Sequence, residues 1–125
     1  MKTVIKTEFA PNPVGPYNQA ILANDTLYIS GQIAIDPAIG KLITGDIKEQ
    51  ALQVMKNLEA ILKEAGMDFS NVVKSCIMVT NLDHFAQVNE VYGSFFSSNP
   101  PARETLQACK LPLNSELEIS MIAIK

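Results

Sequence analysis

One segment of the chain has a strong helical repeat. Over residues 46–65, apolar side chains recur at spacings of three and four residues, which places them along one face of an α-helix. Asp46 is suited to the N-cap, Glu49 follows three residues later, and Gly66 is a typical C-terminal stop. A helix with a single apolar stripe must bury that stripe, and we expect it to pack against a β-sheet.

The remaining segments predict that sheet. Alternating or continuous apolar runs, separated by turns rich in Pro, Gly and Asn, are typical of β-strands. We expect strands at residues 4–5, 19–23, 26–30, 72–79, 102–108 and 116–124, and a second helix from about residue 83 to residue 96. This order predicts an α+β fold in which two helices cover one face of a mixed six-stranded sheet. The 125 residues are expected to form one domain, residues 1–125.

The composition argues against several classes of protein. The net charge is −3 and no cluster of basic residues occurs, which disfavours nucleic acid as the main partner. No apolar run approaches the length needed to span a membrane, and residues 1–8 show no secretion signal, so we expect a cytoplasmic protein. Hydrophobic residues make up 47% of the chain and charged residues 18%, which favours burial of some surface against a partner subunit.

Most catalytic chemistries lack the residues that they need. The only histidine is His84, and no nucleophile motif such as GxSxG accompanies it. The His, Cys, Asp and Glu residues do not have the spacing of a metal site, so we expect no bound metal. Neither GxGxxG nor a P-loop is present, so nucleotide cofactors are not indicated.

Arginine occurs only once among the ten basic residues. Arg103 lies at the start of an expected strand. Its guanidinium group can bind a carboxylate or phosphate through two parallel hydrogen bonds, a geometry that an ammonium group does not offer. One interpretation is therefore an anion-binding residue. The alternative is a structural role, either in an internal ion pair with Glu104 or Glu118 as the partner or as a residue at the rim of the surface.

Strand alternation divides the polar residues between the two faces of the sheet. In the last strand, Glu118 and Ser120 lie opposite the apolar residues that supply the helix-covered face. We expect Arg103 and Thr105 to share one face of their strand, and Arg103 and Glu118 to lie on or near the face that the helices leave uncovered. Asn89 falls on the apolar face of the second helix, where we favour a structural hydrogen bond to the backbone over a ligand contact.

An ordered set of short motifs spans nearly the whole chain. They are PVGPYNQA (13–20), ISGQI (29–33), GDIKEQ (45–50), NVVK (71–74), FAQVN (85–89), PPAR (100–103), LP (111–112) and LEI (117–119). In these motifs and in their order, the sequence resembles the reactive intermediate deaminase family (Rid, formerly YjgF). Each motif alone is weak, whereas the ordered set is highly specific.

The resemblance implies a chorismate-mutase-like fold of the bacillary type and a homotrimer with sites at the subunit interfaces. It also implies an enzyme that hydrolyses enamine and imine intermediates, such as 2-aminoacrylate and 2-aminocrotonate, to 2-oxo acids and ammonia without a cofactor. The family residue that matches Arg103 binds the substrate carboxylate, and Glu118 is our candidate to hold the water and shuttle protons. The other positions that match the family's pocket are Tyr17, Ser30, Gly31, Asn89 and Thr105.

Two positions depart from the family pattern. Glu104 stands where Ser or Thr is usual, and we expect its side chain to point away from Arg103. Ser120 replaces a frequent acidic residue, which leaves Glu118 as the expected sole carboxylate at that place. Two other functions stay open. One is a non-catalytic trimer that binds a small 2-oxo acid and signals to a partner protein. The other is RNA binding or cleavage, which the acidic net charge disfavours.

Overall fold

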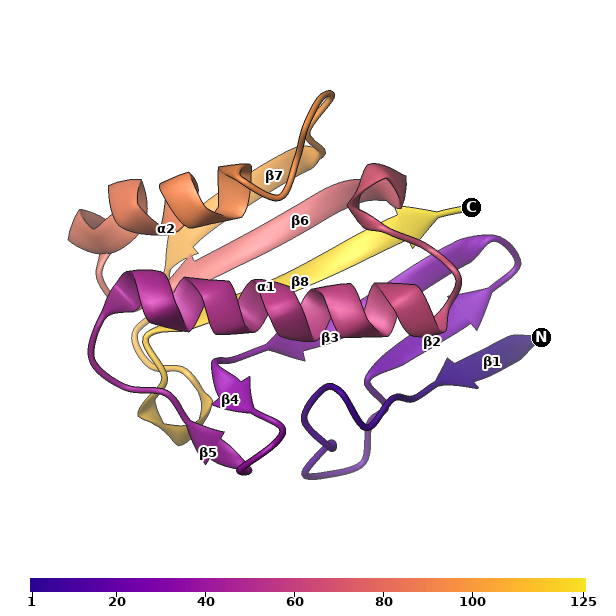
Figure 1. Ribbon diagram of the computed structural model, residues 1–125, viewed down its shortest axis with the longest axis horizontal. Coiled ribbons are helices and arrows are strands. Elements are labelled where there is room, and N and C mark those ends of the chain that lie inside the picture. Colours follow the sequence, from indigo (N-terminus) through magenta and orange to yellow (C-terminus); the bar gives the residue numbers. More distant parts are fainter.

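The computed structural model describes residues 1–125. Six strands form one sheet in the order β1-β2-β3-β8-β6-β7, and two α-helices pack on one of its faces (Figure 1). The strands are β1 (Lys2–Ile5), β2 (Ala20–Ala23), β3 (Thr26–Gln32), β6 (Val72–Val79), β7 (Ala102–Gln107) and β8 (Leu117–Ile124). The helices are α1 (Ile47–Glu64) and α2 (Phe85–Gly93). The predicted arrangement of two helices on one face of a six-stranded sheet is confirmed.

The strand pairing makes the sheet mixed, as predicted. β6 and β7 are parallel, and α2 is the crossover that joins them; all other neighbouring strands are antiparallel. A tight turn joins β2 to β3, where Asn24 has a left-handed φ of 54°, a conformation that Asn tolerates better than most residues. β6 has a partner on both sides, which agrees with its largely apolar sequence.

Some elements differ from the sequence-based expectation. A small separate hairpin is formed by β4 (Ile35–Asp36) and β5 (Lys41–Leu42), where no strand was expected, because two-residue strands carry no detectable periodicity. The second helix is shorter than expected and follows a 3₁₀ turn at Leu82–His84. Further 3₁₀ turns lie at Phe69–Asn71 and Pro112–Asn114.

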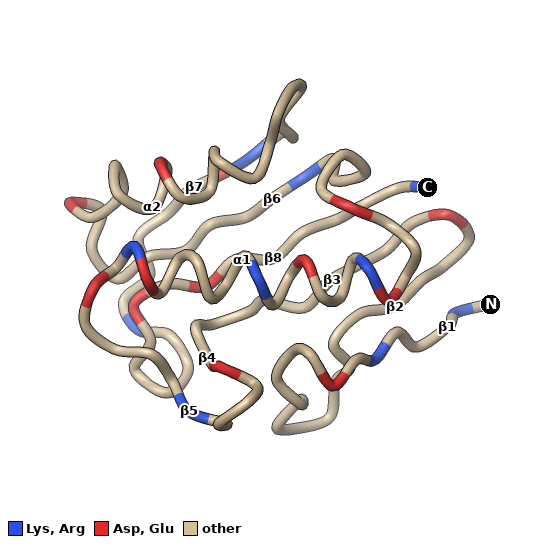
Figure 2. The backbone as a smooth tube through the Cα atoms, viewed as in Figure 1, with Lys and Arg blue, Asp and Glu red and all other residues tan.

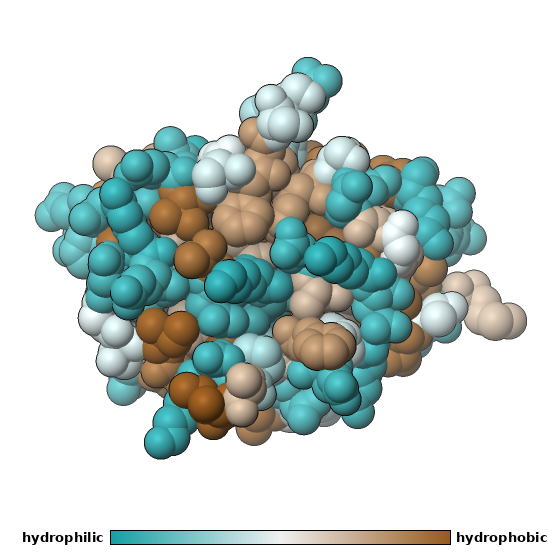
Figure 3. All heavy atoms as spheres, viewed as in Figure 1, coloured by the Kyte–Doolittle hydropathy of each residue, from teal (hydrophilic) through white to brown (hydrophobic).

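Helix α1 has the predicted N-cap and buries the predicted stripe. The Asp46 side chain accepts a hydrogen bond from the Lys48 backbone N–H at 2.9 Å. Val54, Leu58 and Ile61 are fully buried in the core between α1 and the sheet. Figure 3, viewed from the helix side, shows mainly hydrophilic side chains over the outward surface of this layer, with smaller hydrophobic areas between them. The helix therefore stabilises the fold mainly by burying its apolar face.

The other face of the sheet has no helical cover, and we call it the open face. Ile21, Tyr28 and Ile122 lie in register across three neighbouring strands of this face, and Tyr28 is 51% exposed. Leu27 and Ile119, which point toward the helices, are buried. The sheet thus carries apolar side chains on both faces, but only one face is covered within the subunit.

Charged residues are dispersed over the molecule rather than gathered in one patch. Figure 2 shows basic and acidic positions interspersed along the chain. Two ion pairs occur, Lys48 with Glu90 between the helices and Lys74 with Glu104 across β6 and β7. Neither helix combines the length and the apolar character required of a membrane span.

Candidate active site

Glu118 and Gly31 are in close contact on the open face. A Cβ atom added at Gly31 would overlap the Glu118 carboxyl group, whose Cδ would lie only 2.7 Å away. The register of β3 against β8 shifts between Ile29 and Gln32, and this bulge contains Gly31. Glycine is therefore required here for a steric reason: its missing side chain leaves the space that the Glu118 carboxylate occupies.

Burial changes the acidity of Glu118. The side chain is half-buried between β3 and β6, and desolvation raises the pKa of its carboxyl group above the ordinary glutamate value. A raised pKa makes the ionised carboxylate a stronger base. It also brings the pH at which the group gains and loses its proton closer to neutral. Both properties suit a group that transfers protons.

Ser30 and Tyr17 flank the same end of β3. The Ser30 hydroxyl donates a hydrogen bond to the Asn18 carbonyl at 2.6 Å, and the Ser30 backbone N–H donates to the Gln19 carbonyl at 2.9 Å. Tyr17 is half-exposed in the loop that precedes β2. Tyr17 and Ser30 line an open-face groove of about 470 Å³ that extends to Ser120. These residues form, with Glu118 and Gly31, the first group of expected site residues.

Arg103, Asn89 and Thr105 form a second group, on β7 and α2. The Arg103 Nη1 donates a hydrogen bond to Asn89 Oδ1 at 2.7 Å. The guanidinium carbon of Arg103 lies 5.1 Å from the ring centre of Phe85 and 5.2 Å from that of Tyr92, a cation–π geometry. Asn89 is exposed, and its side chain bonds to Arg103 rather than to the backbone that we favoured from the sequence.

A buried hydroxyl pair fixes the aromatic support of Arg103. Tyr92 is buried, and its hydroxyl donates to Ser75 Oγ at 2.9 Å. Burial raises the pKa of Tyr92, so its hydroxyl group keeps the proton that it donates. Neither ion pair of the structure includes Arg103, so the alternative of a structural ion pair with Glu104 or Glu118 is wrong. The guanidinium is oriented by neutral groups and retains donors for an anion.

The prediction that Arg103 lies on the uncovered face is also wrong. Arg103 and Thr105 pair with Ser75 and Ile77 of β6, which are both buried beneath the helices. Paired residues of neighbouring strands point to the same face, so Arg103 and Thr105 face α2. They do share one face, as predicted, but it is the helix-covered one.

The two groups therefore lie on opposite faces of the sheet. Glu118 alternates with buried residues of β8 and points to the open face, as predicted. Arg103 points to the other face, at the edge strand β7. Within one subunit, the structure brings together Tyr17, Ser30, Gly31 and Glu118, and separately Asn89, Arg103 and Thr105, but it does not bring the two groups together.

One of the two departures from the family pattern, Glu104, has a clear structural setting. Glu104 points away from Arg103, as predicted, and its carboxylate forms an ion pair with Lys74 at 2.9 Å. Glu104 consequently lies on the open face, two strands from Glu118. Glu118 is therefore not the sole carboxylate of that face, although the charge of Glu104 is balanced by Lys74.

Comparison with known proteins places the chain in a family. Residues 7–125 match the family described as Endoribonuclease L-PSP. The chain belongs to this family. Human 2-iminobutanoate/2-iminopropanoate deaminase is 46% identical over 125 residues, which are 100% of this chain and 91% of the human one. Close relatives thus include a protein named for an activity on imino acids.

Solved structures of Rid-family proteins have the same fold. The Rid-family protein YyfA of Yersinia pestis is 43% identical and superposes with a TM-score of 0.98 over 100% of both chains. Escherichia coli TdcF, solved with bound serine, is 34% identical with a TM-score of 0.94 over 98% of both chains. The resemblance to the Rid family inferred from the sequence motifs is confirmed.

One residue that supports the expected site was missed in the sequence. The buried Gln19 side chain accepts from the Thr7 backbone N–H at 2.8 Å and donates to the carbonyls of Thr7, Ala10 and Pro11 at 2.9–3.2 Å. These bonds tie residues 7–11 to the segment that carries Tyr17. The signal for it was a polar residue of the motif GPYNQA directly before the apolar strand.

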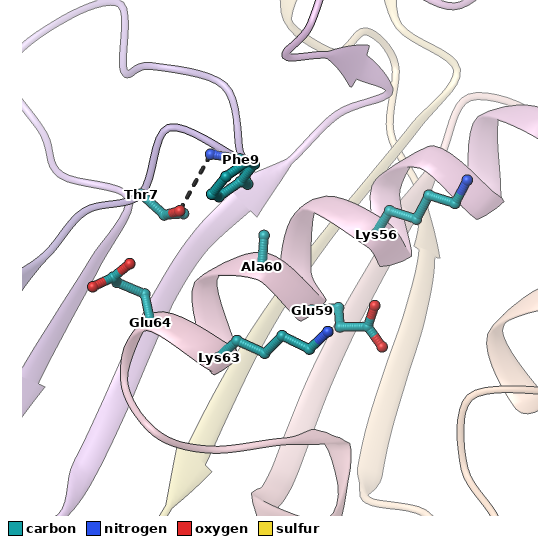
Figure 4. A pocket seen from close by; sticks show the side chains of 7 residues that line it. All are labelled: Thr7, Phe9, Lys56, Glu59, Ala60, Lys63 and Glu64. Carbon is teal, nitrogen blue, oxygen red and sulfur yellow. Dashed lines mark hydrogen bonds between the residues drawn. The ribbon is translucent and has the colours of Figure 1, made fainter.

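The largest surface pocket lies away from the expected site residues. It has a volume of about 530 Å³ and lies between the N-terminal loop and α1, where Phe9 faces Ala60 among charged side chains (Figure 4). None of the expected site residues lines it. No group of His, Cys, Asp and Glu side chains has the arrangement of a metal site.

Proposed function

We propose that this protein is a 2-iminobutanoate/2-iminopropanoate deaminase, which hydrolyses small enamine and imine acids to 2-oxo acids and ammonia. The observation that carries the proposal is the single arginine, held by Asn89 and two aromatic rings without a carboxylate partner. Such a guanidinium is available for a bidentate bond to a substrate carboxylate. The names of relatives at 43–46% identity over the full chain support the same activity.

The proposed reaction needs few groups. The enamine tautomerises to an imine, water attacks the imine carbon, and the resulting carbinolamine loses ammonia. Arg103 holds the carboxylate and so positions the imine carbon. Glu118 accepts a proton from the water and returns it to the departing nitrogen, while backbone groups near Gly31 and Thr105 orient that nitrogen. Free imines hydrolyse in water, so modest acceleration suffices, and we propose that no cofactor or metal takes part.

The proposed site requires two subunits. Glu118 and Arg103 lie on opposite faces of one sheet, so one substrate touches both only if the open face of one subunit meets the α2 and β7 region of the next. That interface joins two different surfaces, which is a head-to-tail contact, and such contacts build rings when they close rather than two-fold dimers. Together with the uncovered apolar face, this supports the proposed homotrimer with a chorismate-mutase-like subunit fold.

Turnover of 2-aminoacrylate tests the proposal. The substrate is made in situ by a serine dehydratase, and pyruvate and ammonia formation is compared with and without the protein. We expect pyruvate and ammonia to form faster when the protein is present. Binding of 2-oxo acids without acceleration would favour a non-catalytic carboxylate-binding protein instead. Salt-sensitive retention or cleavage of RNA, with no effect on the imine, would favour the ribonuclease activity for which the family is described.

A further inference from the structure

Leu113 combines two unfavourable features that folding does not explain. Its backbone is left-handed, with φ 56° and ψ 26°, a conformation that branched and bulky L-residues avoid. Its side chain is 69% exposed, so it contributes little to the core. Asn114, the next residue, has a similar φ of 55°, but Asn tolerates this region. An exposed apolar side chain in a strained turn suggests a role other than stabilising the subunit.

The side chain of Leu113 lines a pocket beside the proposed site. The pocket has a volume of about 320 Å³, which falls at the small end of the range of about 300–1,000 Å³ for ligand sites. Tyr17 and Gly31 line it on the side of the expected site residues. Its other walls are largely apolar and include Val14, Ile33 and Ile35. The pocket contains no charged residue.

Gly31 connects this pocket to the proposed reaction centre. The Glu118 carboxyl group lies against the Cα of Gly31, at the place where a side chain would be. Gly31 also forms part of the pocket wall. An imine carbon held near Glu118 therefore has the pocket as a neighbour, and the substituent on that carbon is the part of the substrate that can enter it.

We propose that this pocket binds the side chain of the imino acid and that Leu113 is a specificity-determining residue that favours apolar side chains longer than ethyl. The inference rests on the proposed deaminase function. Burial of Leu113 against such a side chain removes apolar surface of both from water. A charged side chain would lose its hydration without an opposite charge in this pocket and is disfavoured.

Relative turnover of two imines tests this role. The imines of alanine and leucine are generated in situ by an L-amino-acid oxidase, and the ratio of kcat/KM for the leucine imine to that for the alanine imine is measured. In Leu113→Asn the ratio is expected to fall about tenfold, the scale of a lost apolar contact in a specificity pocket. Asn suits the left-handed backbone, so the same variant should melt at a higher temperature than the parent.

Two comparison variants separate this role from general effects. Leu113→Met keeps an apolar side chain and should keep the ratio within about twofold. Ile39→Asn changes a residue that is 63% exposed and outside the pocket, and it should leave both rates unchanged. An unchanged ratio in Leu113→Asn overturns the proposal. The proposal is also overturned if kcat/KM falls equally for both imines and sedimentation shows that the trimer is lost, because Leu113 would then be an interface residue. A parent that turns over neither imine refutes the deaminase function itself.

Discussion

At the scale of single residues, the proposed chemistry depends on two side chains with different surroundings. Arg103 is exposed and oriented by the amide of Asn89 and by two rings. Glu118 is half-buried against Gly31, and burial raises the pKa of its carboxyl group. The surroundings of Arg103 leave its guanidinium group available to bind an anion. Those of Glu118 bring the pKa of its carboxyl group closer to neutral pH, which favours proton transfer.

Arg103→Lys tests whether the geometry of the guanidinium, rather than its charge, is required. We expect a loss of deaminase activity of at least one to two decades, corresponding to about 1.5–3 kcal/mol for a charge-assisted contact, because an ammonium cannot offer two parallel donors. The melting temperature should change little, since Arg103 is exposed. Lys110→Arg, at another exposed position, should leave activity unchanged. Full activity in Arg103→Lys would mean that the carboxylate binds elsewhere, and unfolding or dissociation would make Arg103 structural.

Glu118→Gln should slow turnover and stabilise the fold at neutral pH. Loss of the proton-transferring group is expected to lower kcat by about 10²–10⁴-fold. Because burial raises the folded-state pKa of Glu118, its protonated form stabilises the folded protein below the unfolded pKa, and this contribution is lost as pH rises through the folded pKa. The variant should therefore melt above the parent at pH 7, and the difference should vanish below about pH 4.

Glu64→Gln serves as the control for that comparison. Glu64 is an exposed carboxylate at the end of α1, far in the sequence from the site residues. It should keep parental activity. Parental turnover in Glu118→Gln would assign the activation of water to backbone groups instead, and a melting difference that persists at acid pH would contradict the effect of burial.

At the scale of elements, the loop before β2 connects the fold to the site. It carries Tyr17, and the amide of Gln19 holds it to residues 7–11 by four hydrogen bonds. The same segment accepts both hydrogen bonds of Ser30. A buried amide in this position fixes the backbone of two loops without adding any group that could react.

Gln19→Met should loosen this loop. The methionine keeps the volume but leaves the Thr7 N–H and neighbouring carbonyls without partners, so we expect a loss of about 3 kcal/mol in the free energy of unfolding, measured with urea. KM should rise more than kcat falls, because the loop positions Tyr17 but does not react. Gln87→Met, at an exposed position of α2, should change stability by less than about 0.5 kcal/mol. Equal stability of Gln19→Met and parent would contradict this role.

At the scale of the whole molecule, the proposed site has its two groups of residues on opposite faces of one subunit, so the proposal includes a second subunit that completes the site. The apolar open face and the exposed edge at β7 are different surfaces of the same chain. In a ring of three subunits, the β7 edge of one subunit would cover the open face of the next at every interface. Each interface would then contain one composite site.

Mixing two inactive variants tests this composite site. Arg103→Lys and Glu118→Gln are unfolded together in equal amounts, refolded and assayed. In randomly mixed rings, about one quarter of the interfaces combine an intact Arg103 with an intact Glu118, so about a quarter of parental activity should return. Each variant refolded alone should stay inactive. No recovery, despite mixed trimers seen by mass spectrometry, would place the whole site within one subunit.

The sequence by itself determined that this protein has one layer of helices packed on one face of a sheet. The repeat of residues 46–65 requires a helix with one buried stripe, and the alternation in β8 places Glu118 on the face opposite the helices; both hold in the structure. The single arginine and the ordered motifs also identified the family and its candidate residues. These features are local patterns. A helix or strand with apolar side chains on one side buries that side, so its orientation relative to the core is fixed by its own sequence.

Only the tertiary structure decided which residues meet. β7 is an edge strand with exposed side chains on both faces, so its own alternation does not reveal which face turns to the helices. That choice comes from the parallel register with β6, which pairs Arg103 with the buried Ser75 and turns it toward α2. The bonds of Gln19 likewise join segments whose approach depends on the folded loop. Contacts across faces and between loops are set by packing of the whole chain, which no local repeat encodes.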